Sequence, residues 1–237
     1  MSKVMLSFAA ALSAAVSLLA APAAAASPDR PVVVELFTAQ GCSACVKAGP
    51  FADRLAAQPG VLPLTFSVDY WDYTGWSDTF AKPAFAARQH AYVKKLHLRD
   101  PYTPQMVVDG RAQASAVKHD EVEALIAQQA RAKTPAPRMF MRADGRFGIG
   151  AGKAVRGGAE VWLVRYDPRL VEVEVKRGDN RGETVVNRNV VRELVRLGGW
   201  AGKPRSYAMP KETDGLAQVV LLQAAGGGRI LAASPIR

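Results

Sequence analysis

The first half of the chain alternates apolar runs of strand length with stretches that have helical spacing. Residues 32–37 and 61–68 are nearly continuous apolar runs, which are typical of buried strands. Residues 83–98 and 119–132 place apolar side chains at helical spacing, which predicts two helices. Residues 102–111 predict a strand that ends in an Asp-Gly turn. Strands and helices in this order predict an α/β domain.

The second half has a different texture, with short Val-, Glu- and Arg-rich runs between glycine clusters. Residues 171–176 alternate valine with charged residues, so we expect one buried and one solvated face. Residues 189–197 fit either a strand or a short helix. Together these features predict a β-rich domain that is sandwich-like or barrel-like. The expected strands are residues 138–142, 160–166, 171–176, 184–187, 217–223 and 229–233.

A proline-rich segment, Thr-Pro-Ala-Pro at residues 134–137, separates the two textures. Each proline blocks the continuation of a helix, which is typical of a linker. We therefore predict a first α/β domain over residues 27–134. The basic β-rich domain is predicted over residues 135–237.

Residues 1–26 have the features of a signal peptide: an early lysine, an Ala-rich apolar core and several small-residue cleavage sites. We therefore expect a periplasmic or secreted protein, in a compartment that permits disulfides. No later apolar run approaches the roughly 20 residues that a membrane span needs. The mature chain is accordingly expected to have no membrane span.

Positive charge is concentrated in the second half. The formal net charge is +10, and residues 135–237 hold 18 Lys and Arg against 10 Asp and Glu. These cations are spread through strands and turns without a nucleic-acid-binding motif, so we expect no nucleic-acid partner. Attraction to acidic partners or anionic envelope surfaces is one explanation of the charge. A generally solvated basic surface is the other.

The chain has two cysteines, and they form a Cys-x-x-Cys motif, Cys42-Ser43-Ala44-Cys45. The motif follows an apolar strand and precedes a helical pattern over residues 46–55. A helix N-terminus stabilises a thiolate, so Cys42 is the candidate nucleophile. Cys42 is also expected to be more exposed than Cys45, the candidate resolving thiol. This layout predicts a dithiol–disulfide exchange site.

Two other interpretations of the cysteine pair stay open. A zinc site usually needs four ligands, and the three histidines are scattered along the chain. We expect no metal and no cofactor. A purely structural disulfide is the stronger alternative, because a four-residue loop can close in an oxidising compartment.

Three features in order give the first half a resemblance to the thioredoxin superfamily. They are the Cys42-x-x-Cys45 motif, Pro50 in the following helix, and Thr103-Pro104 leading into a strand. The resemblance implies a cis Thr103–Pro104 bond and a position for Pro104 against the Cys42 sulfur. There Pro104 and Thr103 would orient the backbone of a bound substrate.

A more specific resemblance covers most of the mature chain. Residues 34–42, 68–76 and 102–110 resemble DUF1223, a bacterial family of exported thioredoxin-like proteins. Residues 177–182 extend the match into the second half. This resemblance supports the fold more than it supports an activity.

Glu35 is a carboxylate within an otherwise apolar strand, seven residues before Cys42. Thioredoxins place a buried Asp near this point, and it relays a proton to the resolving cysteine. By that resemblance Glu35 is a candidate catalytic residue, although the register is one residue off. A Glu at a sheet edge that faces water or pairs with an arginine is the alternative.

Residues 69–76 hold two tryptophans and two tyrosines after a predicted strand. Ligands in open α/β sheets bind beyond the carboxyl ends of strands. Tyr70, Trp71 and Trp76 are therefore candidate substrate-binding residues, together with Thr103. A loop that folds its aromatics onto the protein is the alternative.

The sequence favours an exported thiol–disulfide oxidoreductase that acts on envelope proteins and needs a redox partner. Cys42 would attack, Cys45 would resolve, and Pro104 would orient the substrate. The alternative is a non-catalytic binding or assembly module in which the Cys42–Cys45 bridge stiffens the site. A Ca²⁺ site at Asp69, Asp72 and Asp78 is a further possibility, without an EF-hand pattern.

Overall fold

The computed structural model describes residues 30–132 and 135–236. The predicted signal peptide, residues 1–26, lies outside the described residues. In the first half the elements are β1 (Val32–Thr38), α1 (Ala48–Ala56), β2 (Val61–Ser67), α2 (Pro83–Lys95), β3 (Gln105–Val108), β4 (Ala112–Ser115) and α3 (His119–Arg131), with short 3-10 turns at Ser43–Cys45 and Asp72–Thr74. In the second half they are β5 (Met139–Met141), β6 (Phe147–Ile149), β7 (Ala159–Glu174), β8 (Thr184–Trp200), β9 (Arg205–Tyr207), β10 (Ala217–Ala224) and β11 (Ile230–Ile236).

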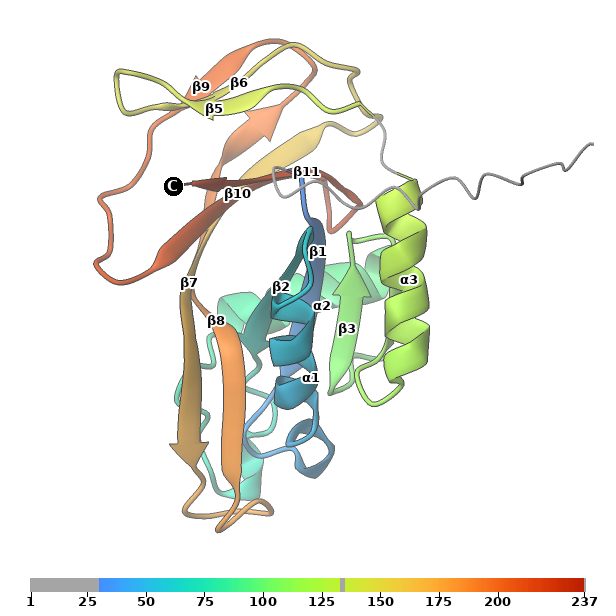
Figure 1. The fold of residues 1–237 in the computed structure, drawn as a ribbon, viewed down its shortest axis with the longest axis vertical. Helices are drawn as coiled ribbons and strands as arrows, with labels where there is room; N and C mark the ends of the chain where they lie inside the picture. Colours follow the sequence, from blue (N-terminus) through green and yellow to red (C-terminus); the bar gives the residue numbers. More distant parts are fainter. Residues whose placement is uncertain (1–29, 133–134, 237) are drawn as a thin grey trace, which may run out of the picture.

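The strands form one large and one small sheet (Figure 1). The large sheet has eight strands in the order β11-β10-β7-β8-β2-β1-β3-β4, and β5, β6 and β9 form the small sheet. The protein is therefore a mixed α/β molecule with a β-rich second half. Four strands of the second half extend the sheet of the first half. The division at residues 134–135 remains a prediction.

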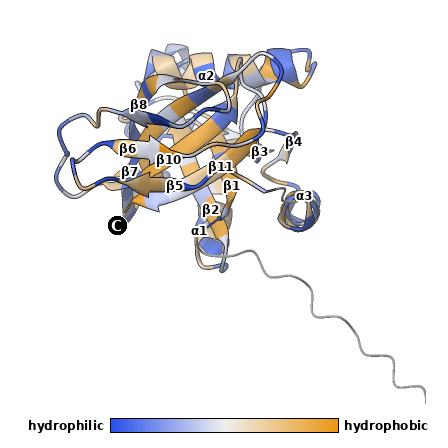
Figure 2. Cartoon of the chain, turned by 90° about the horizontal axis from the view of Figure 1, so that it is seen from above, coloured by the Kyte–Doolittle hydropathy of each residue, from blue (hydrophilic) through white to orange (hydrophobic). Residues whose placement is uncertain are grey.

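Helices cover both faces of the large sheet. Seen from above, α2 lies on one face, and α1 and α3 lie on the other (Figure 2). Alternation along β1 produces these two cores, because successive side chains of a strand point to opposite faces. Val33 and Phe37 pack in the α2 core. Val34 and Leu36 pack with α1 and α3.

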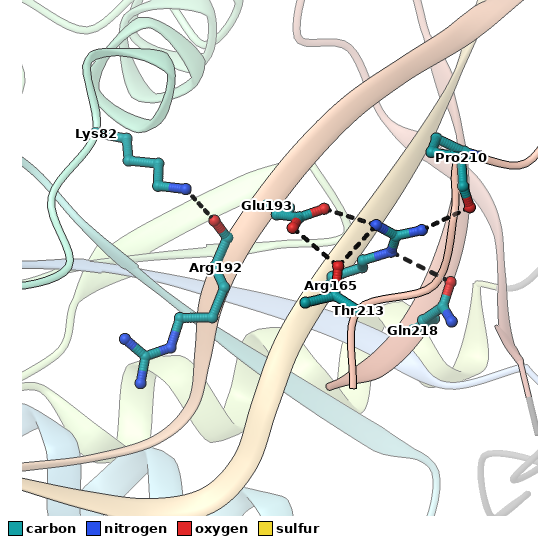
Figure 3. Close-up of polar contacts among 7 residues, drawn as sticks. All are labelled: Lys82, Arg165, Arg192, Glu193, Pro210, Thr213 and Gln218. Carbon is teal, nitrogen blue, oxygen red and sulfur yellow. Dashed lines mark hydrogen bonds and ion pairs between the residues drawn. The ribbon is translucent and has the colours of Figure 1, made fainter. Parts of the chain in front are cut away.

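A third core joins the small sheet to the adjoining end of the large sheet. Its members include Phe147, Ile149, Trp200 and Val220. The segment before β10 is fixed to the sheet by Arg165 of β7, whose guanidinium bonds Glu193, Thr213 and Pro210 (Figure 3).

The two halves meet at β2 and β8. The strands pair at a single position, Thr65 with Val190, and side chains supply the remaining bonds. The Thr65 hydroxyl donates to the Arg188 carbonyl at 2.7 Å, and Asn189 donates to the Pro63 carbonyl at 2.8 Å. The junction therefore depends on side-chain hydrogen bonds more than on a backbone ladder.

Candidate functional site

The two cysteines form a disulfide in the turn that follows β1. The Cys42–Cys45 bridge spans a 3-10 turn, and the backbone N–H of Cys45 donates to the Cys42 carbonyl at 2.9 Å. The predicted helix starts later than residue 46, because α1 begins at Ala48. The influence of a helix terminus falls off within one turn, so α1 stabilises a Cys42 thiolate less than the sequence suggested.

The prediction that Cys42 is more exposed than Cys45 is wrong. Both residues are 1% exposed and belong to the apolar core that packs under α2. Ser43 and Ala44 between them are exposed. The turn therefore presents its middle residues to solvent and its sulfur atoms to the protein.

Thr103 is in direct contact with the disulfide. Its hydroxyl lies 3.2 Å from the Cys42 Sγ, and the Thr103–Pro104 peptide bond is cis, as the resemblance implied. The Trp71 indole N–H donates to the same hydroxyl at 2.7 Å. An indole N–H can only donate, so the hydroxyl accepts from Trp71 and its own proton is directed to the sulfur. The structure thus brings Cys42, Cys45, Thr103, Pro104 and Trp71 together.

The other aromatic residues of the 69–76 segment have separate partners. The Tyr70 hydroxyl donates to Gln89 at 3.1 Å, and burial raises the pKa of Tyr70 to about 12. Trp76 donates to the Gln40 side chain at 2.8 Å. Both Trp71 and Trp76 are half-buried, whereas Tyr73 is 82% exposed and stacks on Trp71. The segment therefore combines internal bonds with one exposed aromatic ring.

Glu35 lies in a buried polar network on the α2 face of the sheet. Its side chain points to the same face of the sheet as those of Val33 and Phe37, and it is buried. Arg88 of α2 donates a hydrogen bond to its carboxylate at 2.7 Å. The Tyr92 hydroxyl bonds the second carboxylate oxygen, and Gln223 of β10 donates to Tyr92 at 2.9 Å. In the described part of the chain no hydrogen bond or ion pair links Glu35 to a cysteine. The structure thus places Glu35 opposite an arginine in the sheet interior.

Gln40, two residues before Cys42, organises the loops around the disulfide. Its side-chain oxygen accepts bonds from Trp76 and Thr79, and its backbone N–H donates to Asp78 at 2.7 Å. Asn180, in the turn between β7 and β8, donates to the Gln40 carbonyl at 2.7 Å. The long β7–β8 hairpin thereby reaches from the second half to the cysteine loop (Figure 1).

Sequence reasoning missed Gln40 and Asn180 as site residues. They are 140 positions apart. Each lies in a segment that resembles DUF1223, but neither segment indicates that the two residues are in contact. The glycine at 178 was the available signal, since it has a positive φ of 77° and a Cβ there would lie 2.9 Å from the Thr74 carbonyl oxygen. This close approach shows that the hairpin turn packs tightly on the aromatic segment.

Asp78 and Asp72 are used for internal bonds. Asp78 accepts backbone N–H groups of Gln40 and Phe80, and Asp72 accepts the N–H of Asp78 at 3.1 Å. Burial raises the pKa of Asp78 above its ordinary value, against the effect of these hydrogen bonds. Within residues 30–132 and 135–236 no cluster of three or more His, Cys, Asp or Glu side chains has the form of a metal site.

The described helices include none with the length and apolar character of a membrane span. The fold and site define a mixed α/β protein with a buried disulfide at one end of its large sheet. A family model described as a protein of unknown function, DUF1223, matches residues 33–223. The chain therefore belongs to the DUF1223 family, as the sequence indicated.

Two solved structures are similar to this chain. The crystal structure of protein AGR_C_4864 from Agrobacterium tumefaciens has 28% identity and a TM-score of 0.70, covering 89% of this chain and 94% of that one. HBP35 of Porphyromonas gingivalis has 10% identity and a TM-score of 0.53, covering 89% and 76%, and this likeness concerns the fold alone. A comparison with curated proteins gave no match.

Proposed function

We propose that this protein is an exported thiol–disulfide oxidoreductase with a thioredoxin-like first domain, acting on envelope proteins. The observation that carries the proposal is the contact of the Thr103 hydroxyl with the Cys42 sulfur, 3.2 Å away. It selects one sulfur of the pair, and it joins that sulfur to the segment expected to orient a substrate. Residues 1–26 support the exported location.

The proposed reaction is a two-step exchange of disulfides. In the reduced protein the Cys42 thiolate attacks one sulfur of a substrate disulfide, that S–S bond breaks, and one substrate thiolate leaves. The Cys45 thiolate then attacks Cys42 in the mixed disulfide, the second substrate thiolate leaves, and the Cys42–Cys45 bond forms. Two electrons pass to the substrate, and with an oxidised protein and a dithiol substrate the same steps run in reverse.

Thr103 and Trp71 would act on the first step as positioning groups. A hydroxyl that donates to sulfur favours the charged thiolate and so lowers the pKa of the thiol. Because Trp71 donates to Thr103, the hydroxyl proton is held toward Cys42 when the disulfide opens. In this arrangement a side chain supplies the thiolate stabilisation that the distant start of α1 does not.

One observation favours the alternative, a binding or assembly module with a structural disulfide. Both cysteines are buried, and the loop before them is bonded to Asn180, so a substrate disulfide meets Ser43 and Ala44 first. Exchange therefore requires the covering segments to move aside. A bridge that never opens would be packed in the same way.

Trapping of mixed disulfides distinguishes the two functions. Cys45→Ala leaves the attacking thiol without a resolving partner, so envelope proteins should accumulate in disulfide-linked complexes with this variant. Cys42→Ala should trap few, and the variant with both substitutions is the control for non-covalent association. Non-reducing gels of acid-quenched cells followed by mass spectrometry measure the result. Equal trapping by both single variants, or none by either, would sink the proposal.

A further inference from the structure

We propose that the chain has a second binding site, a cleft for a small organic molecule with several negatively charged oxygen atoms. The cleft has a volume of about 1020 Å³. Ligand pockets span roughly 300–1,000 Å³, so there is room for more than a single inorganic ion. Its walls come from both halves of the chain.

The cleft lies at the opposite end of the large sheet from the disulfide. β3 runs antiparallel to β1, with Gln105 opposite Phe37 and Val108 opposite Val34. Arg111, which follows β3, therefore lies where β1 begins, whereas Cys42 follows the point where β1 ends. The second site is thus separate from the proposed exchange site.

Every charged side chain that lines the cleft is a cation. They are Lys95, Arg111, Lys153, Arg156 and Arg229. Within the described residues none of them has an ion pair or a side-chain hydrogen bond to another part of the chain. Charges of one sign around a concave surface concentrate the electrostatic field, so a cleft lined by cations attracts anions. Arginine and lysine together suit oxyanions such as carboxylates and phosphates.

The five cations come from four separate places in the chain. Lys95 ends α2, Arg111 lies in the β3–β4 turn, Lys153 and Arg156 precede β7, and Arg229 lies between β10 and β11. A solvated charged face on a single helix would show a local run of charge. Convergence of unpaired cations from distant segments onto one cleft instead favours a common ligand.

Trp200 provides an independent indication of a ligand. It lines the cleft at the end of β8, is 2% exposed, and its indole N–H has no acceptor among the described residues. Buried polar groups are generally hydrogen-bonded, and an orphan donor calls for an explanation. The Trp200 ring forms part of the cleft wall, and a ligand oxygen would supply the missing acceptor once binding shifts the side chains that cover the N–H. Leu96, Val155 and Leu231 add apolar wall, which suits the carbon skeleton of an organic anion.

Calorimetric titration of the oxidised mature protein with two probes tests the site. Inorganic tripolyphosphate represents phosphorylated ligands, and citrate represents carboxylates. We expect one-to-one binding of at least one probe with a dissociation constant below about 1 mM at low salt. Binding of one probe alone assigns the chemical class of the ligand. Failure of both probes to bind would overturn the proposal.

Matched variants separate a specific cleft from general charge attraction. Arg111→Ala with Arg229→Ala removes two cleft cations and should weaken binding about tenfold or more. Lys203→Ala with Lys211→Ala removes the same charge at exposed positions outside the cleft and should change binding less than about twofold. Equal weakening by both pairs would contradict the proposal. If the arginine pair fails to fold, Lys153→Gln with Arg156→Gln in the exposed loop repeats the test.

Ligand binding in the cleft should not depend on the proposed oxidoreductase activity, and one variant tests this. Cys42→Ser with Cys45→Ser abolishes exchange but leaves every lining residue of the cleft in place. It should bind the probes as the wild type does. Loss of binding in this variant would show that the cleft depends on the disulfide, and would overturn its placement as a separate site.

Discussion

At the disulfide end of the large sheet, residues from both halves of the chain bond one another. At the cleft end, five cations have no ion pair or side-chain hydrogen bond within the described residues. The first arrangement gains stability from the bonds, while the second costs stability through repulsion between like charges. The disulfide end is also covered by neighbouring segments, and the cleft end is open. The two ends thus differ in what their side chains contribute to the folded state.

The same fold thus covers one proposed site and leaves the other open. At the disulfide end the reactive atoms are covered, so the proposed chemistry depends on the segments that cover them. At the cleft end no movement is needed for a ligand to enter. Substitutions at the disulfide end are therefore expected to change stability and reactivity together. Substitutions at the cleft end are expected to change ligand binding alone.

The largest stability effect is expected between the two ends, at the Glu35–Arg88 pair. Arg88→Met removes the cation and leaves a buried carboxylate unpaired, which costs about 3–5 kcal/mol of unfolding free energy. Glu35→Gln combined with Arg88→Met removes the charge from both members and should recover part of the loss. Denaturant unfolding measures both. A loss below about 1 kcal/mol for Arg88→Met would show that the network is not a major support of the sheet.

A smaller effect is expected at the β7–β8 turn, which bonds the loop just before the disulfide. Gly178→Ala combines a positive φ with a clash against the Thr74 carbonyl oxygen, and Gly182→Ala is the control, with a φ of 88° and no atom within 4 Å of the added Cβ. Gly178→Ala should cost about 1–3 kcal/mol more than the control. It should also speed reduction of the disulfide by a phosphine, because the turn is displaced. Equal rates in the two variants would show that the turn does not control access.

The pH dependence of stability tests the same end through Asp78. Burial raises the pKa of Asp78, so its carboxylate is disfavoured in the folded state. Its contribution to stability is therefore complete below the unfolded pKa of 3.8 and is lost as pH rises through the folded pKa. Relative to Asp78→Asn, the wild type should lose unfolding free energy across that rise. A difference that is independent of pH would contradict the raised pKa.

The smallest stability effect is expected at the cleft. Lys153→Gln with Arg156→Gln removes two exposed, unpaired cations and breaks no bond within the described chain. The unfolding free energy should stay within about 0.5 kcal/mol of the wild type. Thermal and denaturant unfolding measure it. A clear loss would mean that these side chains are structural, which would remove the contrast between the two ends.

The local elements were largely predictable from the sequence. The helices expected at residues 83–98 and 119–132 are α2 and α3, each within a few residues of its predicted bounds. The strand expected at residues 61–68 is β2. Apolar periodicity determines these elements because each one buries a face against its neighbours within the same half of the chain.

The long strands of the second half were not predictable as single strands. Residues 160–166 and 171–176 were expected to be separate strands, but residues 160–166 and 171–174 lie in the single strand β7. The interruption contains Pro168, and the pairing with β8 is irregular between Asp167 and Leu170. Proline is tolerated in a sheet at such a bulge, so the strand continues past it. Pairing with β8, and not the local sequence, therefore determines that β7 continues as one strand past Pro168.

The candidate site was predictable only in its covalent and motif-bearing members. The cysteine motif and Thr103-Pro104 identified four residues that the structure brings together. The bond from Asn180 to the Gln40 carbonyl depends on tertiary folding and has no local signal. Glu35 was singled out as an unusual polar residue, and its partner Arg88 lies in a helix 53 positions away.

The pKa of the Cys42 thiol in the reduced protein, from the pH dependence of alkylation, tests the central claim most directly. The account predicts a value below the ordinary value of about 8.5. It also predicts a higher value in Thr103→Val, which loses the hydroxyl, and a wild-type value in Thr103→Ser, which keeps it. An ordinary or raised pKa in the wild type, unchanged by Thr103→Val, would contradict an exchange site and favour a structural disulfide.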